Sequence, residues 1–225
     1  MGDLIPSLIV IAVTGLVVGL IFYLVHRNKT AKEKAIRDLA AANGWTYEPV
    51  VERLASGFRL RKGSWVIEAL TISSSNSEAG PGSSTTSSST RWFSGEPRLS
   101  EGMVLIGPRQ PEVNLGNVSS FLMQAALRLM IGPDTKDVAG IQQVELGSLA
   151  LMQRFMVWTN REEAAKKLLS QQVESTLINW SNKLLPVVKF SPSGLEVSVK
   201  EARLCKEADL FALVKLGNAL LDAAA

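Results

Sequence analysis

An uncharged, apolar run over residues 4–25 most constrains what this chain can fold into. At about 1.5 Å per residue, a helix of this length spans roughly 33 Å, close to the ~30 Å of a bilayer core. A secretory signal peptide would have a basic N-terminus, a shorter apolar run and a small-residue cleavage site. Here the only charge before the run is Asp3, within a tail at 1–3, and the residues at the end of the run, YLVHRNK, contain no A-x-A pattern. The run therefore predicts a retained, single-pass transmembrane helix.

The charges that flank this run predict its orientation. Five cations follow it within a dozen residues, namely Arg27, Lys29, Lys32, Lys34 and Arg37. No Lys or Arg precedes it, so the positive-inside rule places the N-terminus outside the cell (inner) membrane and the rest of the chain in the cytoplasm. The five cations belong to a basic juxtamembrane helix predicted over 26–44, and we expect them to contact anionic headgroups of the lipid bilayer.

Small residues recur at one-turn spacing inside the apolar run. Ala12, Gly15 and Gly19 share one helix face, which would let a second helix backbone approach closely. Glycine is common in membrane helices, so the same spacing also arises by chance. The pattern identifies these three residues as a candidate helix–helix contact.

Most of the chain is electrically neutral, although its net charge is +3 and its pI is about 9.1. Five of the 24 Lys/Arg and one of the 21 Asp/Glu lie in residues 26–37, and Asp3 lies before them. From residue 38 onward, the remaining 19 cations and 19 anions cancel. Because nucleic-acid affinity comes largely from many phosphate contacts, this balance predicts no nucleic-acid partner.

The residue types of common catalytic and metal sites are scarce. His26 is the only histidine and Cys205 the only cysteine, so the chain has no material for an intrachain disulfide, a zinc site or a Ser–His–Asp triad. The stretch GFRLRKGS lacks the GK[ST] ending of a phosphate-binding loop. The sequence therefore predicts no catalytic residue, no cofactor and no metal.

Residues 45–225 predict a single α+β domain with a mainly antiparallel sheet. Strand formers occur at 45–50, 58–72, 91–93, 103–107 and 155–159, and SPSG joins two strands in a hairpin over 187–200. Helices are expected after Ser119 and Ser120, from an Asn160 N-cap to about Leu185, and over 208–224. The dipeptide NG at 43–44 predicts the end of the helix before the domain.

A Ser-rich stretch over 73–90 interrupts the strand pattern. Strand character resumes after it, which makes an interdomain linker the poorer interpretation. Ser, Gly and Thr bury too little apolar surface to offset the entropy of ordering, so we interpret the stretch as a disordered loop within one domain. A functional loop that gates a site is the alternative.

Several segments together resemble a group of bacterial proteins. The apolar N-terminal run, NGWTYEP, FMVWTNREEAAKKLLS and SPSGLEVSV look like bacterial single-pass membrane-anchored α+β proteins of unknown function. The resemblance implies this architecture and supplies no catalytic residues.

Two functions of different classes follow. The first is a non-catalytic binding or assembly subunit that presents a neutral α+β domain to a membrane-protein partner or to a second copy of itself. The alternative is a membrane-anchored enzyme, in which Glu48, Glu68 and Glu145 meet in a carboxylate site gated by the Ser-rich loop. Exposed glutamates on strand faces would look the same in the sequence.

Overall fold

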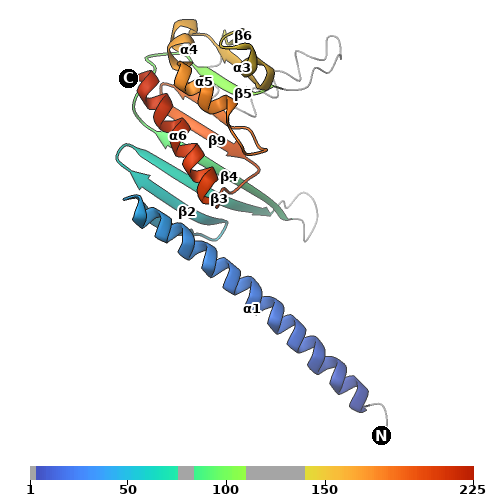
Figure 1. Ribbon diagram of the computed structural model, residues 1–225. Coiled ribbons are helices and arrows are strands. Elements are labelled where there is room, and N and C mark those ends of the chain that lie inside the picture. Colours follow the sequence, from blue (N-terminus) through green and yellow to red (C-terminus); the bar gives the residue numbers. More distant parts are fainter. Residues whose placement is uncertain (1–3, 76–83, 110–139) are drawn as a thin grey trace, which may run out of the picture. The chain divides into compact units, whose positions relative to one another are not determined.

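A computed structural model of the chain describes residues 4–75, 84–109 and 140–225 (Figure 1). The chain divides into two compact units, Met1–Gly44 and Trp45–Ala225. The first unit is one long helix, α1 (Leu4–Ala42). It ends where the backbone N–H of Asn43 donates to Leu39 and Gly44 adopts a φ of +64°, a left-handed conformation that costs glycine little. The helix stop predicted at 43–44 is confirmed.

The predicted transmembrane helix over 4–25 is wrong. Within the part of the chain that the structure describes, no helix is both long enough and apolar enough to cross a membrane. The predicted single-pass topology, the outside N-terminus and the inner-membrane location with a cytoplasmic domain are corrected with it.

The second unit confirms the α+β class and the antiparallel sheet. Its strands are β1 (Thr46–Val51), β2 (Ala55–Lys62), β3 (Trp65–Ser75), β4 (Ser84–Ser94), β5 (Val104–Pro108), β6 (Gln142–Val144), β7 (Phe155–Thr159), β8 (Val187–Ser191) and β9 (Gly194–Lys200). They form one nine-stranded sheet in the order β1-β2-β3-β4-β9-β8-β5-β7-β6. The hairpin predicted over 187–200 is confirmed as β8–β9, and it joins the β1–β4 meander to the other three strands.

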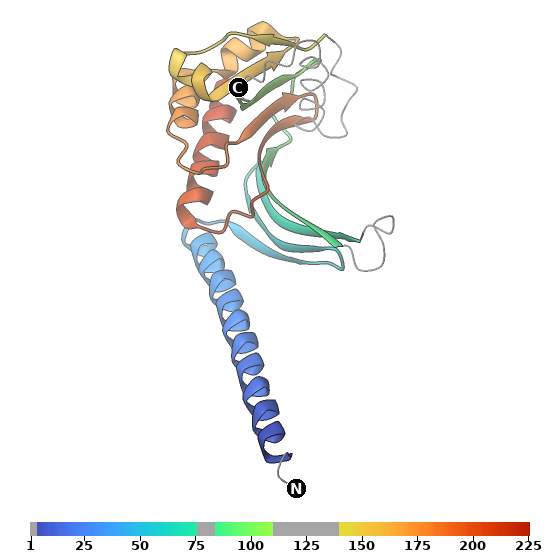
Figure 2. The ribbon, with the colours of Figure 1, turned by 90° about the vertical axis from the view of Figure 1, so that its right-hand side faces the viewer.

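In the described residues of this unit, four helices accompany the sheet: α3 (Leu149–Arg154), α4 (Glu162–Leu168), α5 (Gln171–Ile178) and α6 (Glu207–Ala224). The longest, α6, packs across β4 and β9, with α4 and α5 beside it on the same face (Figure 1, Figure 2). Gly217 of α6 lies directly on the indole of Trp92 in β4. Alternate strand residues are fully buried on this side, among them Leu60, Ile67 and Val197. We call this the helix face.

Beyond β9, the opposite face of the sheet is also buried. A second apolar cluster is formed by Met103, which directly precedes β5, Leu105 of β5, Trp158 of β7 and Val187 of β8, each at most 5% exposed. Leu105 pairs with Trp158 on one side and with Lys189 on the other. Directly paired residues share a face. The cluster therefore lies on the same side as Lys189 and opposite the helices.

The helix expected from Asn160 to Leu185 is two shorter helices. The chain leaves helical geometry at Leu169, and Ser170 starts α5 by accepting a hydrogen bond from the Val173 N–H. Asn160 does not cap α4, because its side-chain oxygen accepts from the Met103 N–H of the strand region instead. The apolar spacing along this segment predicted helix correctly. Where α4 and α5 begin and end is set by tertiary contacts.

The Ser-rich stretch over 73–90 is mostly strand, so its interpretation as a loop was wrong at both ends. Ser73 pairs with Thr86, Ser74 with Thr85, and Ser75 with Ser84 in the β3–β4 ladder. The backbones of these polar residues are paired between β3 and β4. The amino-acid composition of the segment does not reveal this pairing. The helix expected after Ser119 and Ser120 lies outside the described residues, as do residues 76–83.

Candidate binding surface

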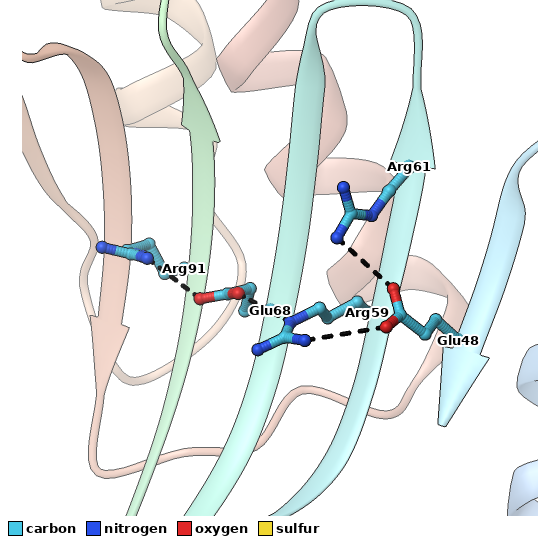
Figure 3. Close-up of polar contacts among 5 residues, drawn as sticks. All are labelled: Glu48, Arg59, Arg61, Glu68 and Arg91. Atoms are coloured by element: carbon cyan, nitrogen blue, oxygen red, sulfur yellow. Dashed lines mark hydrogen bonds and ion pairs between the residues drawn. The ribbon is translucent and has the colours of Figure 1, made fainter. Parts of the chain in front are cut away.

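Opposite charges alternate across the face of β1–β4 that points away from the helices. We call this the open face, and we call its charges the ion-pair row: Glu48, Arg59, Arg61, Glu68, Arg91, Glu196 and Lys189 (Figure 3). Figure 3 shows the first five side chains reaching toward one another across four neighbouring strands.

The register of the meander produces this row. Glu48 lies directly opposite Arg59, Arg59 opposite Glu68, and Glu68 opposite Arg91. Directly opposite residues in an antiparallel pair hold their Cβ atoms about 5 Å apart on the same face. The two-residue alternation of β2 places Phe58 and Leu60 in the core and leaves the arginines on the open face.

Glu68 is the centre of the row. One carboxylate oxygen, Oε1, accepts from Arg59 Nε at 2.8 Å, and the other, Oε2, accepts from Arg91 Nη2 at 2.9 Å. Glu48 bridges the two arginines of β2, at 3.7 Å from Arg59 Nη1 and 3.3 Å from Arg61 Nη2. Each carboxylate therefore lies between two guanidinium groups.

The outer end of the row, at the sheet edge, is more exposed than its inner end. The side chains of Arg61 and Glu48 are 52% and 47% exposed, whereas those of Lys189 and Glu196 are 11% and 18% exposed. Arg91 links the two ends, because its other terminal nitrogen lies 3.9 Å from Glu196 and its guanidinium lies over the Phe93 ring. The inner end of the row borders the apolar cluster around Leu105.

The electrostatics of Glu68 are those of a carboxylate held ionised. Burial opposes its ionisation, but hydrogen bonds from Arg59 and Arg91 and the charges of both arginines more than offset this, so the pKa of Glu68 is lowered. The hydrogen bond and charge of Glu68 in turn raise the pKa of Arg59. The Glu68 carboxylate and the Arg59 guanidinium therefore both stay charged near neutral pH. They can bind and orient other groups, but they do not exchange protons.

The three glutamates proposed for a carboxylate site are not brought together. Glu48 and Glu68 share the open face but are separated by Arg59, and each is bound by arginines. Glu145 follows β6, at the opposite edge of the sheet from β1. In the described parts of the chain, no three His, Cys, Asp or Glu side chains are grouped to hold a metal ion.

The predicted contact residues of α1 remain predictions. Arg27, Lys32, Lys34 and Arg37 are exposed on the helix, while the side chain of Lys29 is outside the described residues. Their expected contact with lipid headgroups relied on the corrected transmembrane helix. No described atom lies within 4 Å of a Cβ added at Gly15 or Gly19, and the side chain of Ala12 is not described.

Comparisons with known proteins add little. No protein-family model and no curated protein matches the chain. Among solved structures, the crystal structure of the mycobacterial trehalose monomycolate transport factor A, TtfA, matches with a TM-score of 0.41 and 9% identity, covering 85% of this chain and 93% of that one. A likeness of this size bears on neither the fold nor the function of this chain.

Proposed function

We propose that this chain is a non-catalytic binding or assembly protein, and that it presents the open face of β1–β4 to a protein partner. The observation that carries the proposal is the ion-pair row, whose five members on β1–β4 form an ordered array of charges with 23–52% of each side chain exposed. Each of its central carboxylates is committed to arginines, so the row offers recognition rather than proton transfer.

The open face has the composition of a protein interface. Half-buried Val66 and Phe93 border the row on one side, Leu70 borders it on the other, and Ile72 beyond is 44% exposed. Arginine carries five N–H donors, so Arg61 and Arg91 have donors left for a partner after bonding to their glutamates. Interfaces between proteins are enriched in arginine and aromatic residues and use such mixed faces.

The charge balance of the row favours a protein partner over a nucleic acid. Three glutamates lie among its four cations, so few positive charges remain for phosphates. A membrane protein or a second copy of this chain, both expected from the sequence, would suit the face. The carboxylate enzyme is not favoured by any contact of the row.

The proposal is tested by affinity purification of the tagged full chain from the cells that produce it. Arg61→Glu places a like charge beside Glu48 at an exposed position and changes the face without removing a buried group. Lys166→Glu on α4 is the matched control, because Lys166 is similarly exposed and is also paired with glutamates.

We expect a protein that is retained by the wild type and by Lys166→Glu, and lost with Arg61→Glu. Urea unfolding of all three chains would show that folding is unchanged. Retention of the same proteins by both variants would contradict a role for the open face.

A further inference from the structure

Strand β4 is paired on both sides along only part of its length. β4 pairs with β3 over Ser84–Ser94, but with β9 only over Ser89–Ser94. Along 84–88, no strand in the described parts of the chain pairs with its second side. The β1–β4 meander extends here away from β8 and β9 (Figure 2).

A groove of about 500 Å³ lies at this free stretch. It is lined by Thr86, Ser87, Ser88, Ser89, Lys200 and Glu201. Successive side chains of a strand point to opposite faces. A cavity lined by four consecutive residues therefore lies along the strand edge, where the main-chain N–H and C=O groups point, and not on either face.

The chain that follows β9 turns away from this edge. After Lys200 the backbone turns away through Glu201, which has a φ of +64°. The buried hydroxyl of Thr90 then holds the departing segment, donating to the Ala202 carbonyl at 3.0 Å and accepting from the Leu204 N–H at 2.8 Å. These contacts direct the chain toward α6 rather than along β4.

The two outer edges of the sheet carry features that protect an edge, and the described residues of this stretch carry none. Proteins block free edges with proline, charged side chains or very short strands. β1 carries Glu48 and Pro49, and β6 has only three residues. The free stretch of β4 is STTSS, which contains neither proline nor charge.

We propose that the free edge of β4 binds an extended, acidic peptide segment of a partner protein, which adds to the sheet as a strand beside residues 84–88. The proposal rests on the proposed function and specifies how the partner is held. Main-chain hydrogen bonds along an edge supply affinity in such complexes, and side-chain pockets supply selectivity.

Lys200 provides the preference for an acidic segment. It lies directly opposite Ser89, at the point where the groove begins. Burial, with a smaller contribution from the Lys189 charge, lowers the pKa of Lys200, and Glu196 only partly offsets this. A peptide carboxylate beside Lys200 would favour its charged form. Glu201 also lines the groove, and its charge would weaken an acidic ligand.

The probe is a blocked hexapeptide of alternating valine and threonine that ends in glutamate, added at millimolar concentration to the isotope-labelled full chain. We expect shifts in the backbone amide NMR signals of residues 85–89 and 200–201. The same peptide ending in lysine should bind more weakly. Shifts confined to other regions, or equal binding of both peptides, would overturn the proposal.

Two alternately N-methylated forms of the acidic peptide test strand addition itself. In an added strand, every second N–H faces the protein, and the glutamate fixes which ones. One form should therefore bind about tenfold more weakly, because it loses two or three main-chain hydrogen bonds, while the other binds as before. Equal affinity of the two forms would exclude strand addition.

Variants of the groove complete the test. Lys200→Ala should remove the preference for glutamate over lysine, Glu201→Gln should tighten the acidic peptide, and Lys183→Ala, outside the groove, should leave both affinities unchanged. If the peptides fail to bind but Arg61→Glu still releases a cellular partner, the edge proposal fails and the proposed function stands. If the peptides bind and no partner depends on Arg61, the open face is not the partner surface.

Discussion

Glu68 joins β2, β3 and β4 through two arginines, and its removal measures what the ion-pair row contributes to stability. We expect Glu68→Gln to lower the free energy of unfolding by about 1 kcal/mol at neutral pH, because it weakens two charge-assisted hydrogen bonds at a partly solvated site. Urea unfolding gives the value. Glu163→Gln, at a side chain that is 89% exposed on α4, is the control and should change it by less than about 0.5 kcal/mol.

The lowered pKa of Glu68 also predicts how the stability difference between wild type and Glu68→Gln depends on pH. The folded-state pKa of Glu68 lies below its ordinary value of 4.5, so its stabilisation is complete above that value and is lost as the pH falls through the folded-state pKa. The difference in stability between wild type and Glu68→Gln should therefore be constant near neutral pH and shrink in acid. A difference that grows in acid would contradict the assigned ionisation.

Gly217 is the position where helix propensity and packing oppose each other. Alanine is favoured over glycine inside a helix by about 1 kcal/mol. At Gly217, however, an added Cβ would overlap the indole of Trp92, which is fully buried and has no room to move. Overpacking of a core costs about 1–3 kcal/mol, so we expect Gly217→Ala to destabilise the protein. Asn218→Ala, on the exposed side of α6, should be neutral or stabilising in the same thermal unfolding assay.

At the scale of elements, Thr90 holds the junction between β4, β9 and α6. Thr90→Val keeps the shape of the side chain but leaves the Ala202 carbonyl and the Leu204 N–H without their partner. We expect a loss of about 2 kcal/mol, because each orphaned buried group retains its desolvation cost. Thr85→Val, at an exposed position of the same strand, should change stability by less than about 0.5 kcal/mol in chemical denaturation.

Elements with strong local signals could be predicted from the sequence, and those formed by tertiary contacts could not. The β8–β9 hairpin has its turn residues and alternation in one short segment. Residues 84–88 become strand only because β3 supplies the matching ladder. The break at Leu169–Ser170 has a weak local signal, since a serine inside a helical pattern is tolerated as often as it caps a new helix.

The ion-pair row was predictable only in part. The turn between β2 and β3 lies at Gly63–Ser64, because Lys62 pairs with Trp65, and from it the Arg59–Glu68 pair follows by counting back along both strands. Arg91 and Glu196 join the row through pairings between distant segments, which no local pattern encodes. The free edge of β4 could not be predicted from the sequence either, because it depends on where β9 ends.

At the scale of the whole molecule, the division at Gly44 and Trp45 predicts that residues 45–225 fold alone. Trp45 belongs to this unit, since its ring meets Trp65 and Phe211 edge-on at centroid distances of 5.8 and 5.7 Å. A chain that begins at Trp45 should unfold cooperatively. One that begins at Thr46 should be less stable by about 3 kcal/mol, as expected for loss of a large buried side chain. Equal stability of the two, by urea titration, would contradict this.

The position of β9 between β4 and β8 also means that β4 is synthesised well before one of its two neighbouring strands. Thr90 and its partner Ala202 are 112 residues apart, and contacts of this separation form late. At a translation rate of about 5–20 residues per second, β4 leaves the ribosome roughly ten seconds before the strand that pairs with it. Through that interval the nascent meander carries an unpaired edge along all of β4, so this protein is most open to misassociation while it is still being made.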